Sequence, residues 1–143
     1  MAPRPPRLQK KDYELLAEFR SSLRQFLRFS EQAARDAGIA PQQHQALLAI
    51  KGAPGRDRLL VGELAERLQI LPHSAVGLAD RLVAKGYACR VPDEVDGRRV
   101  YLALTSQGEA VLDELSAAHR AQLRTLGPRI NQLVRRISRG ARP

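Results

Sequence analysis

The sequence predicts a mainly α-helical fold with a small β-wing, and three observations support this. Residues 61–84 contain two short runs of apolar residues at helical spacing, separated by Ile70-Leu71-Pro72. Residues 87–104 then change to a period of two, which is typical of strands. Long stretches with helical spacing lie on both sides, at residues 12–37 and 106–139. We therefore expect a winged helix-turn-helix at residues 41–105, between two long helical regions.

Two short amphipathic helices are expected to form the helix-turn-helix. The first, over residues 61–68, buries Leu64, Ala65 and Leu68, and the second buries Ala75, Leu78, Ala79 and Leu82. Pro72 disfavours a helical conformation at Leu71 and fits the first turn of the helix that follows. This second helix is expected to end at Lys85-Gly86, because a glycine after the last periodic residue is a common left-handed cap.

The outer face of the second helix carries mostly small or hydrogen-bonding side chains, with cations toward its end. These residues are His73, Ser74, Val76, Gly77, Asp80, Arg81 and Lys85. A helix with such a face can lie in a DNA major groove. We expect His73 and Ser74 to bind base edges or phosphates, and Val76 to contact a thymine methyl. Arg81 and Lys85 are expected to contact phosphates, with solvated surface charges as the alternative.

Two further residues of this helix have other expected roles. Gly77 either lets the backbone approach DNA closely or relieves crowding, and it weakens the helix in both cases. Asp80 is expected to pair with a nearby arginine rather than to contact a base.

A three-stranded wing is expected after the helix-turn-helix. Val100, Leu102 and Leu104 alternate with Arg99, Tyr101 and Ala103, which predicts one buried face. Residues 87–91 form the partner strand, and a short strand at residues 58–61 joins the same sheet. The turn over residues 92–98 contains Pro, Asp and Gly and leads to Arg98-Arg99, so the hairpin has an exposed basic tip, and both arginines are expected to contact DNA.

Several motifs in this order resemble the MarR family of bacterial transcription regulators. They are LAERL at residues 64–68, DRL at 80–82, KG at 85–86 and RVPDEVDGRRVYLALTSQGEAVL at 90–112. The wing pattern of the family is met by Asp96, Arg98, Val100, Leu102, Leu104 and Thr105. The resemblance covers about residues 12–126. It departs at Val76 and Gly77, where the family has polar residues.

The resemblance implies a double-stranded-DNA-binding regulator, most simply a repressor. In the family, the arginine that corresponds to Arg98 enters the minor groove and Asp96 orients it, so groove width contributes to specificity. The family also holds small aromatic or anionic effectors in a cleft, which here implies a pocket near Arg20, Phe26, Phe29 and His44. An ordinary surface or core histidine is the favoured alternative for His44.

The first and last helical regions predict a homodimer. Large apolar residues on residues 12–37 spread over a stripe too wide for one small domain to cover. Asp12 is expected to cap this helix and Gly38 to end it, while Thr105 caps the next helix and Gly127-Pro128 breaks it before a last helix at 128–139. The expected dimer contacts are Leu15, Leu16, Phe19, Leu23, Ile130, Leu133, Val134 and Ile137. Two such copies would bind a pseudo-palindromic operator.

The net charge of +9 favours a polyanionic partner but does not locate the site. Eleven of the 24 Lys and Arg lie before residue 12 or after residue 114, while residues 12–114 hold the other 13 with all 15 acidic residues. Residues 1–11 are expected to be a flexible basic arm, either solvated or touching phosphates, and residues 140–143 a tail.

Other classes of protein are disfavoured. The chain has no GxSxG motif, no paired carboxylates in a plausible cleft and no metal-ligand spacing among His44, His73, His119 and Cys89, so we expect no enzyme activity, metal or cofactor. No apolar run is long enough for a membrane span or a signal peptide, which predicts a cytoplasmic protein without a membrane partner. The single cysteine, Cys89, is expected to be a small buried residue rather than a redox switch. A winged-helix module for architectural DNA binding or protein association remains the alternative function.

Overall fold

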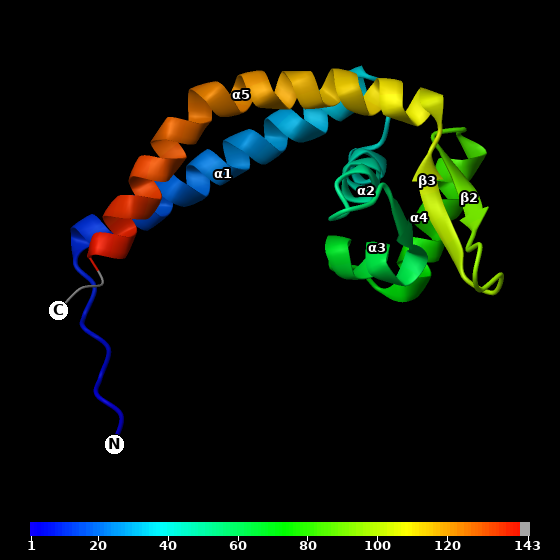
Figure 1. Ribbon diagram of the computed structural model, residues 1–143. Coiled ribbons are helices and arrows are strands. Elements are labelled where there is room, and N and C mark those ends of the chain that lie inside the picture. The colour runs from blue at the N-terminus through cyan, green and yellow to red at the C-terminus, as the bar shows by residue number, and fades with distance from the viewer. Residues whose placement is uncertain (141–143) are drawn as a thin grey trace. The chain divides into compact units, whose positions relative to one another are not determined.

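The computed structural model describes residues 1–140 and confirms the mainly helical fold with a small sheet (Figure 1). The elements are α1 (Lys10–Asp36), α2 (Pro41–Lys51), β1 (Arg58–Leu60), α3 (Val61–Leu68), α4 (Pro72–Ala84), β2 (Ala88–Pro92), β3 (Val100–Leu104) and α5 (Ser106–Arg139). Unit 1 comprises Met1–Ser30 with the segment that begins at Ala118, and unit 2 comprises Glu31–Ala117. None of the helices in residues 1–140 is apolar over a stretch that could cross a membrane. The rest of the predicted tail, residues 141–143, lies outside the described residues.

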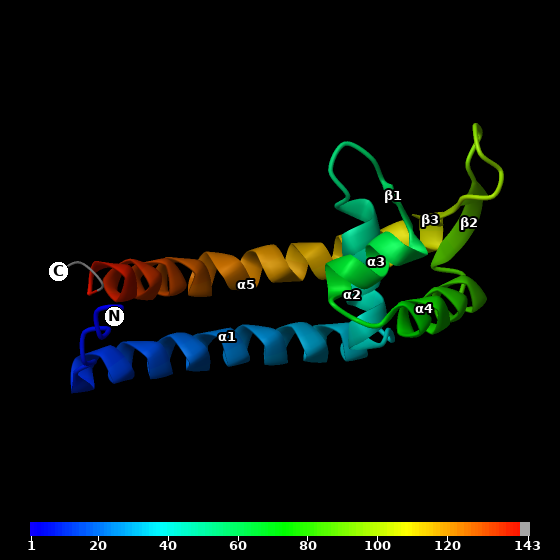
Figure 2. The same cartoon turned by 90° about the horizontal axis from the view of Figure 1, so that it is seen from below.

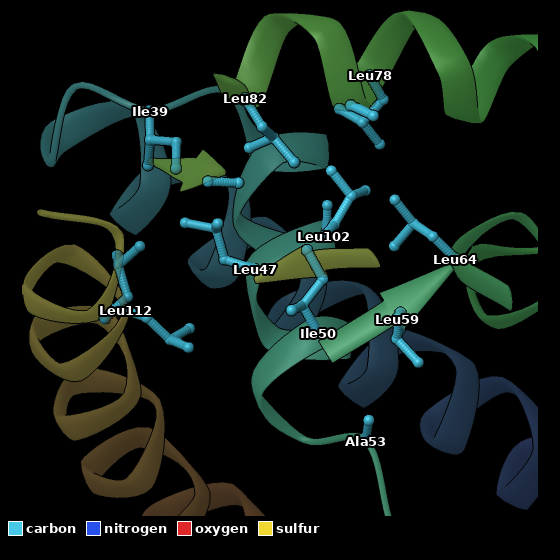
Figure 3. Close-up of a cluster of buried hydrophobic side chains, with 14 of the residues drawn as sticks. Ile39, Leu47, Ile50, Ala53, Leu59, Leu64, Leu78, Leu82, Leu102 and Leu112 are labelled. Atoms are coloured by element: carbon cyan, nitrogen blue, oxygen red, sulfur yellow. The ribbon is translucent and has the colours of Figure 1, made fainter. Parts of the chain in front are cut away.

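Unit 2 has a closed apolar core. Its largest fully buried side chains are Leu47, Ile50, Leu59, Leu64, Leu78, Leu82 and Leu102. Figure 3 shows these side chains from α2, α3, α4 and the sheet converging on one centre. Burying one such side chain stabilises the fold by roughly 1.5–3 kcal/mol, as an upper estimate. The core therefore fixes α4 and the sheet against α2 and α3.

The corner between α3 and α4 depends on a left-handed residue. Gln69 follows α3 with φ 55°, and the amide of Ile70 donates a hydrogen bond of 3.0 Å to the carbonyl of Ala65. Leu71 is extended, with φ −67° and ψ 147°, and Pro72 is the first residue of α4. The predicted role of Leu71-Pro72 is confirmed. The left-handed Gln69 was not predicted, because glutamine carries no preference for this conformation.

The sheet has the strand order β1-β3-β2, and both pairs are antiparallel. The third strand at β1 is confirmed, but the predicted alternation of β3 is wrong at two positions. Tyr101 is only 9% exposed, because the Arg58 guanidinium lies 4.3 Å from its ring centroid and covers it. Val100 is exposed at the start of the strand. Cys89 on β2 is half-buried, where full burial was expected.

Thr105 joins the end of α4 to the start of α5. Gly86 follows α4 in the predicted left-handed conformation, with φ +79°. The Thr105 hydroxyl donates to the Gly86 carbonyl at 2.5 Å and accepts from the Gly108 amide at 3.1 Å, which confirms its role as a helix cap. Gly108 is required for packing, because a Cβ there would lie 2.0 Å from the carbonyl oxygen of Tyr87.

The start of α1 differs from the prediction. The helix begins at Lys10, so Asp12 stands inside the first turn instead of before it, and two residues of the predicted arm are helical. The Asp12 carboxylate accepts a hydrogen bond of 2.7 Å from the amide of Gln9, which caps the helix from within. Gly38, at φ +79°, follows the helix end as predicted.

The predicted break at Gly127-Pro128 is wrong, because α5 continues through both residues to Arg139. Proline inside a helix removes a backbone hydrogen bond and costs about 3 kcal/mol. Leu126 and Leu133, on either side of the proline, are each only 6% exposed. Packing of these side chains within unit 1 offsets the local cost.

Candidate nucleic-acid interface

Helix α4 has one buried and one exposed side. Its buried residues are Ala75, Leu78, Ala79 and Leu82, each at most 1% exposed. The exposed residues are His73, Val76, Asp80, Arg81 and Lys85, while Ser74 and Gly77 are half-buried. The structure thus holds α4 by its apolar side and leaves most of the side predicted to contact DNA in solvent.

Arg81 lies beside Gly77 on the outer surface of α4. A Cβ built on Gly77 would stand 3.4 Å from Nη1 of Arg81, which is an ordinary van der Waals contact. An alanine therefore fits at this position, but a larger side chain would compete with the guanidinium for space. The packing of the chain itself therefore does not require a glycine at this position.

An ion pair connects α4 with the wing. Asp80 on α4 and Arg90 on β2 form a hydrogen-bonded salt bridge, which confirms that Asp80 has an arginine partner. Both side chains are largely exposed, at 60% for Asp80 and 44% for Arg90. Solvent screening therefore limits the contribution of the pair to about 1 kcal/mol or less. The pair orients β2 against α4 rather than holding the fold together.

The tip of the wing is organised by two aspartates. Asp93 accepts a hydrogen bond from the Val95 amide, and Asp96 accepts one from the Arg98 amide, each at 3.1 Å. The Asp96 carboxylate also lies 3.5 Å from Nε of Arg98, whose side chain is 95% exposed. Figure 2 shows the hairpin between β2 and β3 protruding from unit 2. The structure thus places an arginine in solvent with an adjacent carboxylate that limits its orientations.

Val95 is a feature of the tip that the sequence did not single out. Its side chain is 96% exposed at the end of the hairpin. An apolar residue held there has no partner in unit 2 to explain its position. The tip therefore exposes an apolar side chain, Val95, on the same loop as the exposed cation of Arg98.

Arg99 is exposed, but its charge also acts on a residue within unit 2. Its charge contributes to lowering the pKa of Glu63. The main cause of that lowered pKa is the hydrogen-bonded ion pair with Arg56, followed by the Leu60 amide, which donates to Glu63 at 3.0 Å. Arg99 therefore has an electrostatic role in unit 2 besides the contact with DNA predicted for it.

Residues 37–99 are similar to a known protein family. The sequence model of the MarR family matches residues 37–99, from the end of α1 to the wing. Over these residues, the chain is similar to the MarR family. The HTH-type transcriptional repressor MdtR of Bacillus subtilis strain 168 is 32% identical over 84 residues. That match covers 59% of this chain, and the chain spans about half of the relative, at 52% of its length.

Several solved structures share the fold of this chain. A MarR family protein from Bacillus stearothermophilus has a TM-score of 0.74 and 22% identity, over 85% of this chain and 82% of its own. The YusO protein from Bacillus subtilis has a TM-score of 0.66 and 22% identity, over 95% and 98%. A MarR mutant from E. coli, complexed with operator DNA, has a TM-score of 0.61 and 22% identity, over 89% and 86%. At these identities the likeness shows the fold.

The residues predicted for an effector pocket are divided between the two units. In unit 1, Phe26 and Phe29 pack edge-on against the ring of His119, with centroids 5.8 and 5.5 Å away. Nε2 of His119 lies 2.7 Å from the Ser30 hydroxyl. Arg20 is exposed in the same unit, and His44 is buried in unit 2 at 2% exposure. The sequence did not single out His119, because its aromatic contacts come from residues 90 or more positions away.

The residues predicted for dimerisation differ in exposure. Leu16 and Val134 are 41% and 42% exposed, whereas Leu133 is 6% exposed. The others, Leu15, Phe19, Leu23, Ile130 and Ile137, are half-buried. Leu16 and Ile137 also line a groove of about 540 Å³ in unit 1, together with Pro5, Pro6, Leu8, Asp12 and Gly140. The chain therefore carries a partly uncovered apolar surface on unit 1.

Proposed function

We propose that this chain is a sequence-specific transcription regulator that binds double-stranded DNA as a homodimer and represses transcription. The observation that carries this function is the build of unit 2, where a closed core anchors α4 by one side only and the wing presents Arg98 beside it. Two relatives support it by name, since MdtR is a transcriptional repressor and the E. coli MarR mutant was solved with operator DNA. The predicted division into arm, dimerisation helices and DNA-binding region at residues 41–105 is part of this proposal.

Helix α4 supplies the direct contacts to bases. Because His73 and Ser74 stand in its first turn, their side chains can donate and accept hydrogen bonds at base edges. Val76, half of whose surface is exposed, can meet a thymine methyl. Gly77 keeps this part of the helix narrow, while Arg81 and Lys85 neutralise phosphates at the edge of the groove.

The wing contributes to specificity by indirect readout, in which the shape of the groove is recognised and not the identity of a base. Arg98 enters the minor groove, where a narrow groove with strong negative potential attracts its guanidinium. Asp96 restricts the arginine before DNA binds, so less side-chain freedom is lost on binding. Arg99 contributes a phosphate contact at the base of the wing.

Unit 1 provides the surface that contacts a second copy of the chain. The uncovered apolar residues of α1 and α5, Leu16 and Val134 foremost, are buried against the same residues of a partner. Two α4 helices then reach successive major grooves about one helical turn apart, so the operator is a pseudo-palindrome. A small aromatic or anionic effector releases the DNA.

Selection of bound duplexes from a random pool tests this function. The expected outcome is an enriched motif of two inverted half-sites about 10 base pairs apart. Val76→Ala is expected to change the preferred bases within each half-site, whereas Leu48→Ala, an equally exposed apolar residue on α2, is not. Enrichment of no motif would contradict a sequence-specific regulator and favour an architectural protein.

A further inference from the structure

Unit 1 carries a charge that DNA recognition by α4 and the wing does not use. Its residues 1–30 and 118–140 contain 13 Lys and Arg and three Asp and Glu, whereas residues 31–117 contain ten and twelve. The last acidic residue of the sequence is Glu114. The part of α5 in unit 1 therefore has only positive formal charges along its length.

A groove on α5 gathers part of this charge. The groove has a volume of about 560 Å³ and is lined by Pro128, Asn131, Gln132, Arg135, Arg136 and Arg139. All six residues are exposed. Within residues 1–140, none of these three arginines forms an ion pair, whereas the neighbouring Arg129 is paired with Glu18. The groove thus offers three guanidinium groups and two side-chain amides to a ligand.

Two of these arginines, Arg135 and Arg139, lie on the side of α5 away from its apolar stripe. At 100° per residue, they point about 120–160° away from Leu133 and Ile137, which are buried and half-buried, whereas Arg136 lies about 60° from Leu133. A second copy that covers the apolar stripe therefore leaves Arg135 and Arg139 in solvent. Along the helix Arg135 and Arg139 are four residues and thus about 6 Å apart, which suits a ligand with repeated negative charges.

Stabilisation of the helix end explains only part of the cluster. Cations in the last turn offset the helix macrodipole, and Arg136 and Arg139 stand there. Arg135 lies before the last turn, and Arg120 and Arg124 continue the cationic surface further toward the start of the helix. Like charges three or four residues apart repel, so a cluster without acidic partners costs the isolated helix stability.

We propose that the groove of Arg135, Arg136 and Arg139 is a second, sequence-independent site that binds the phosphate backbone of nucleic acid. The planar guanidinium fork can donate two hydrogen bonds to two phosphate oxygens. Because a guanidinium is more weakly hydrated than an ammonium group, arginine suits this contact better than lysine does. Asn131 and Gln132 add neutral donors beside the arginines. The site goes beyond the function proposed for α4 and the wing and does not depend on it.

A salt titration with a random-sequence duplex tests the site. The triple variant Arg135→Gln, Arg136→Gln and Arg139→Gln is expected to weaken binding at low salt by about tenfold or more, and to lower the slope of log affinity against log salt by about 2–3, at roughly 0.9 per phosphate contact. The matched variant Arg24→Gln, Arg28→Gln and Arg35→Gln removes the same charge from exposed positions of α1 and should change the slope less. Circular dichroism checks that both variants stay folded.

Three results would overturn the site. The first is an unchanged slope in the groove variant, even with a lowered melting temperature, which would mean a helix-dipole role alone. The second is an equal loss in the α1 variant, which would mean a general effect of net charge. The third is equally tight binding of polyglutamate by the wild-type chain, which would point to acidic proteins. Arg98→Ala separates the two functions, because it should reduce binding to the selected duplex while most of the slope on random duplex remains.

Discussion

The two units of the chain differ in how completely they bury their apolar side chains and in their formal charge. Unit 2 closes its own core, with seven large side chains fully buried, and its formal charges nearly balance. Unit 1 leaves Leu16 and Val134 more than 40% exposed and has an excess of ten positive formal charges. In the function proposed above, the surface that contacts DNA therefore depends on a rigid support more than on a high charge. Under the same proposals, unit 1 contributes attraction to a polyanion and part of the dimer interface.

The largest expected effect comes from opening the core of unit 2. Leu78→Ala removes a side chain that is 1% exposed on the buried side of α4, and we expect it to lower the free energy of unfolding by about 2–5 kcal/mol. Val76→Ala, on the opposite side of the same helix, should change it by less than about 0.5 kcal/mol. Urea denaturation followed by circular dichroism measures both. Similar losses in the two variants would mean that α4 is not anchored by one side.

Substitutions on the apolar surface of unit 1 should weaken dimerisation. The double variant Leu16→Glu and Val134→Glu places two charges on the apolar surface proposed to meet a second copy, so we expect the dimer dissociation constant to rise by about 100-fold or more. Sedimentation velocity over a range of concentrations measures it. The double variant Glu31→Gln and Gln32→Glu, at exposed polar positions of α1, serves as the control. A dimer as tight as that of the wild type would place the interface elsewhere.

Arg98→Ala tests whether the wing acts without supporting the fold. Because this side chain is 95% exposed, we expect no change in the melting temperature or in the dimer. Affinity for the selected duplex should fall by about 10- to 100-fold, as for the loss of a charge-assisted hydrogen bond of about 1.5–3 kcal/mol. Fluorescence anisotropy with a labelled duplex measures it, and Glu94→Gln on the same loop is the control. Unchanged affinity would refute the minor-groove role of the wing.

The smallest expected effect is an increase in stability. Gly77→Ala introduces a Cβ at van der Waals distance from Arg81, so the helix gains about 0.5–1 kcal/mol without a clash. Calorimetry should show a melting temperature raised by a few degrees, about 2–5 °C. A lowered melting temperature would mean that the close contact with the arginine is repulsive.

Local patterns predicted unit 2 well, because its elements follow rules that act within a few residues. The caps at Gly86 and Thr105 and the turn at Pro72 were all readable from the chain. The burial of Tyr101 was not, because it depends on Arg58, which stands on another strand. The aspartates and Arg98 of the wing were recognised from their spacing, whereas the exposed Val95 carried no local signal.

Unit 1 was harder to predict, because long-range packing decides it. Gly127-Pro128 normally ends a helix, but the buried leucines on either side keep α5 continuous. His119 meets Phe26 and Phe29 only through the pairing of α1 with α5, which no local rule supplies. The charge of the termini was visible in the sequence, but the groove that collects Arg135, Arg136 and Arg139 was not.

Methylation protection on the selected duplex tests the central claim most directly, because N7 of guanine lies in the major groove. If two copies insert α4 by its exposed side, guanines should be protected in two clusters about 10 base pairs apart on one face of the duplex. Val76→Ala should alter protection inside both clusters while Arg98→Ala leaves their spacing unchanged. Protection spread evenly along the duplex, or clusters that Val76→Ala does not affect, would contradict the assignment of α4 as the recognition helix.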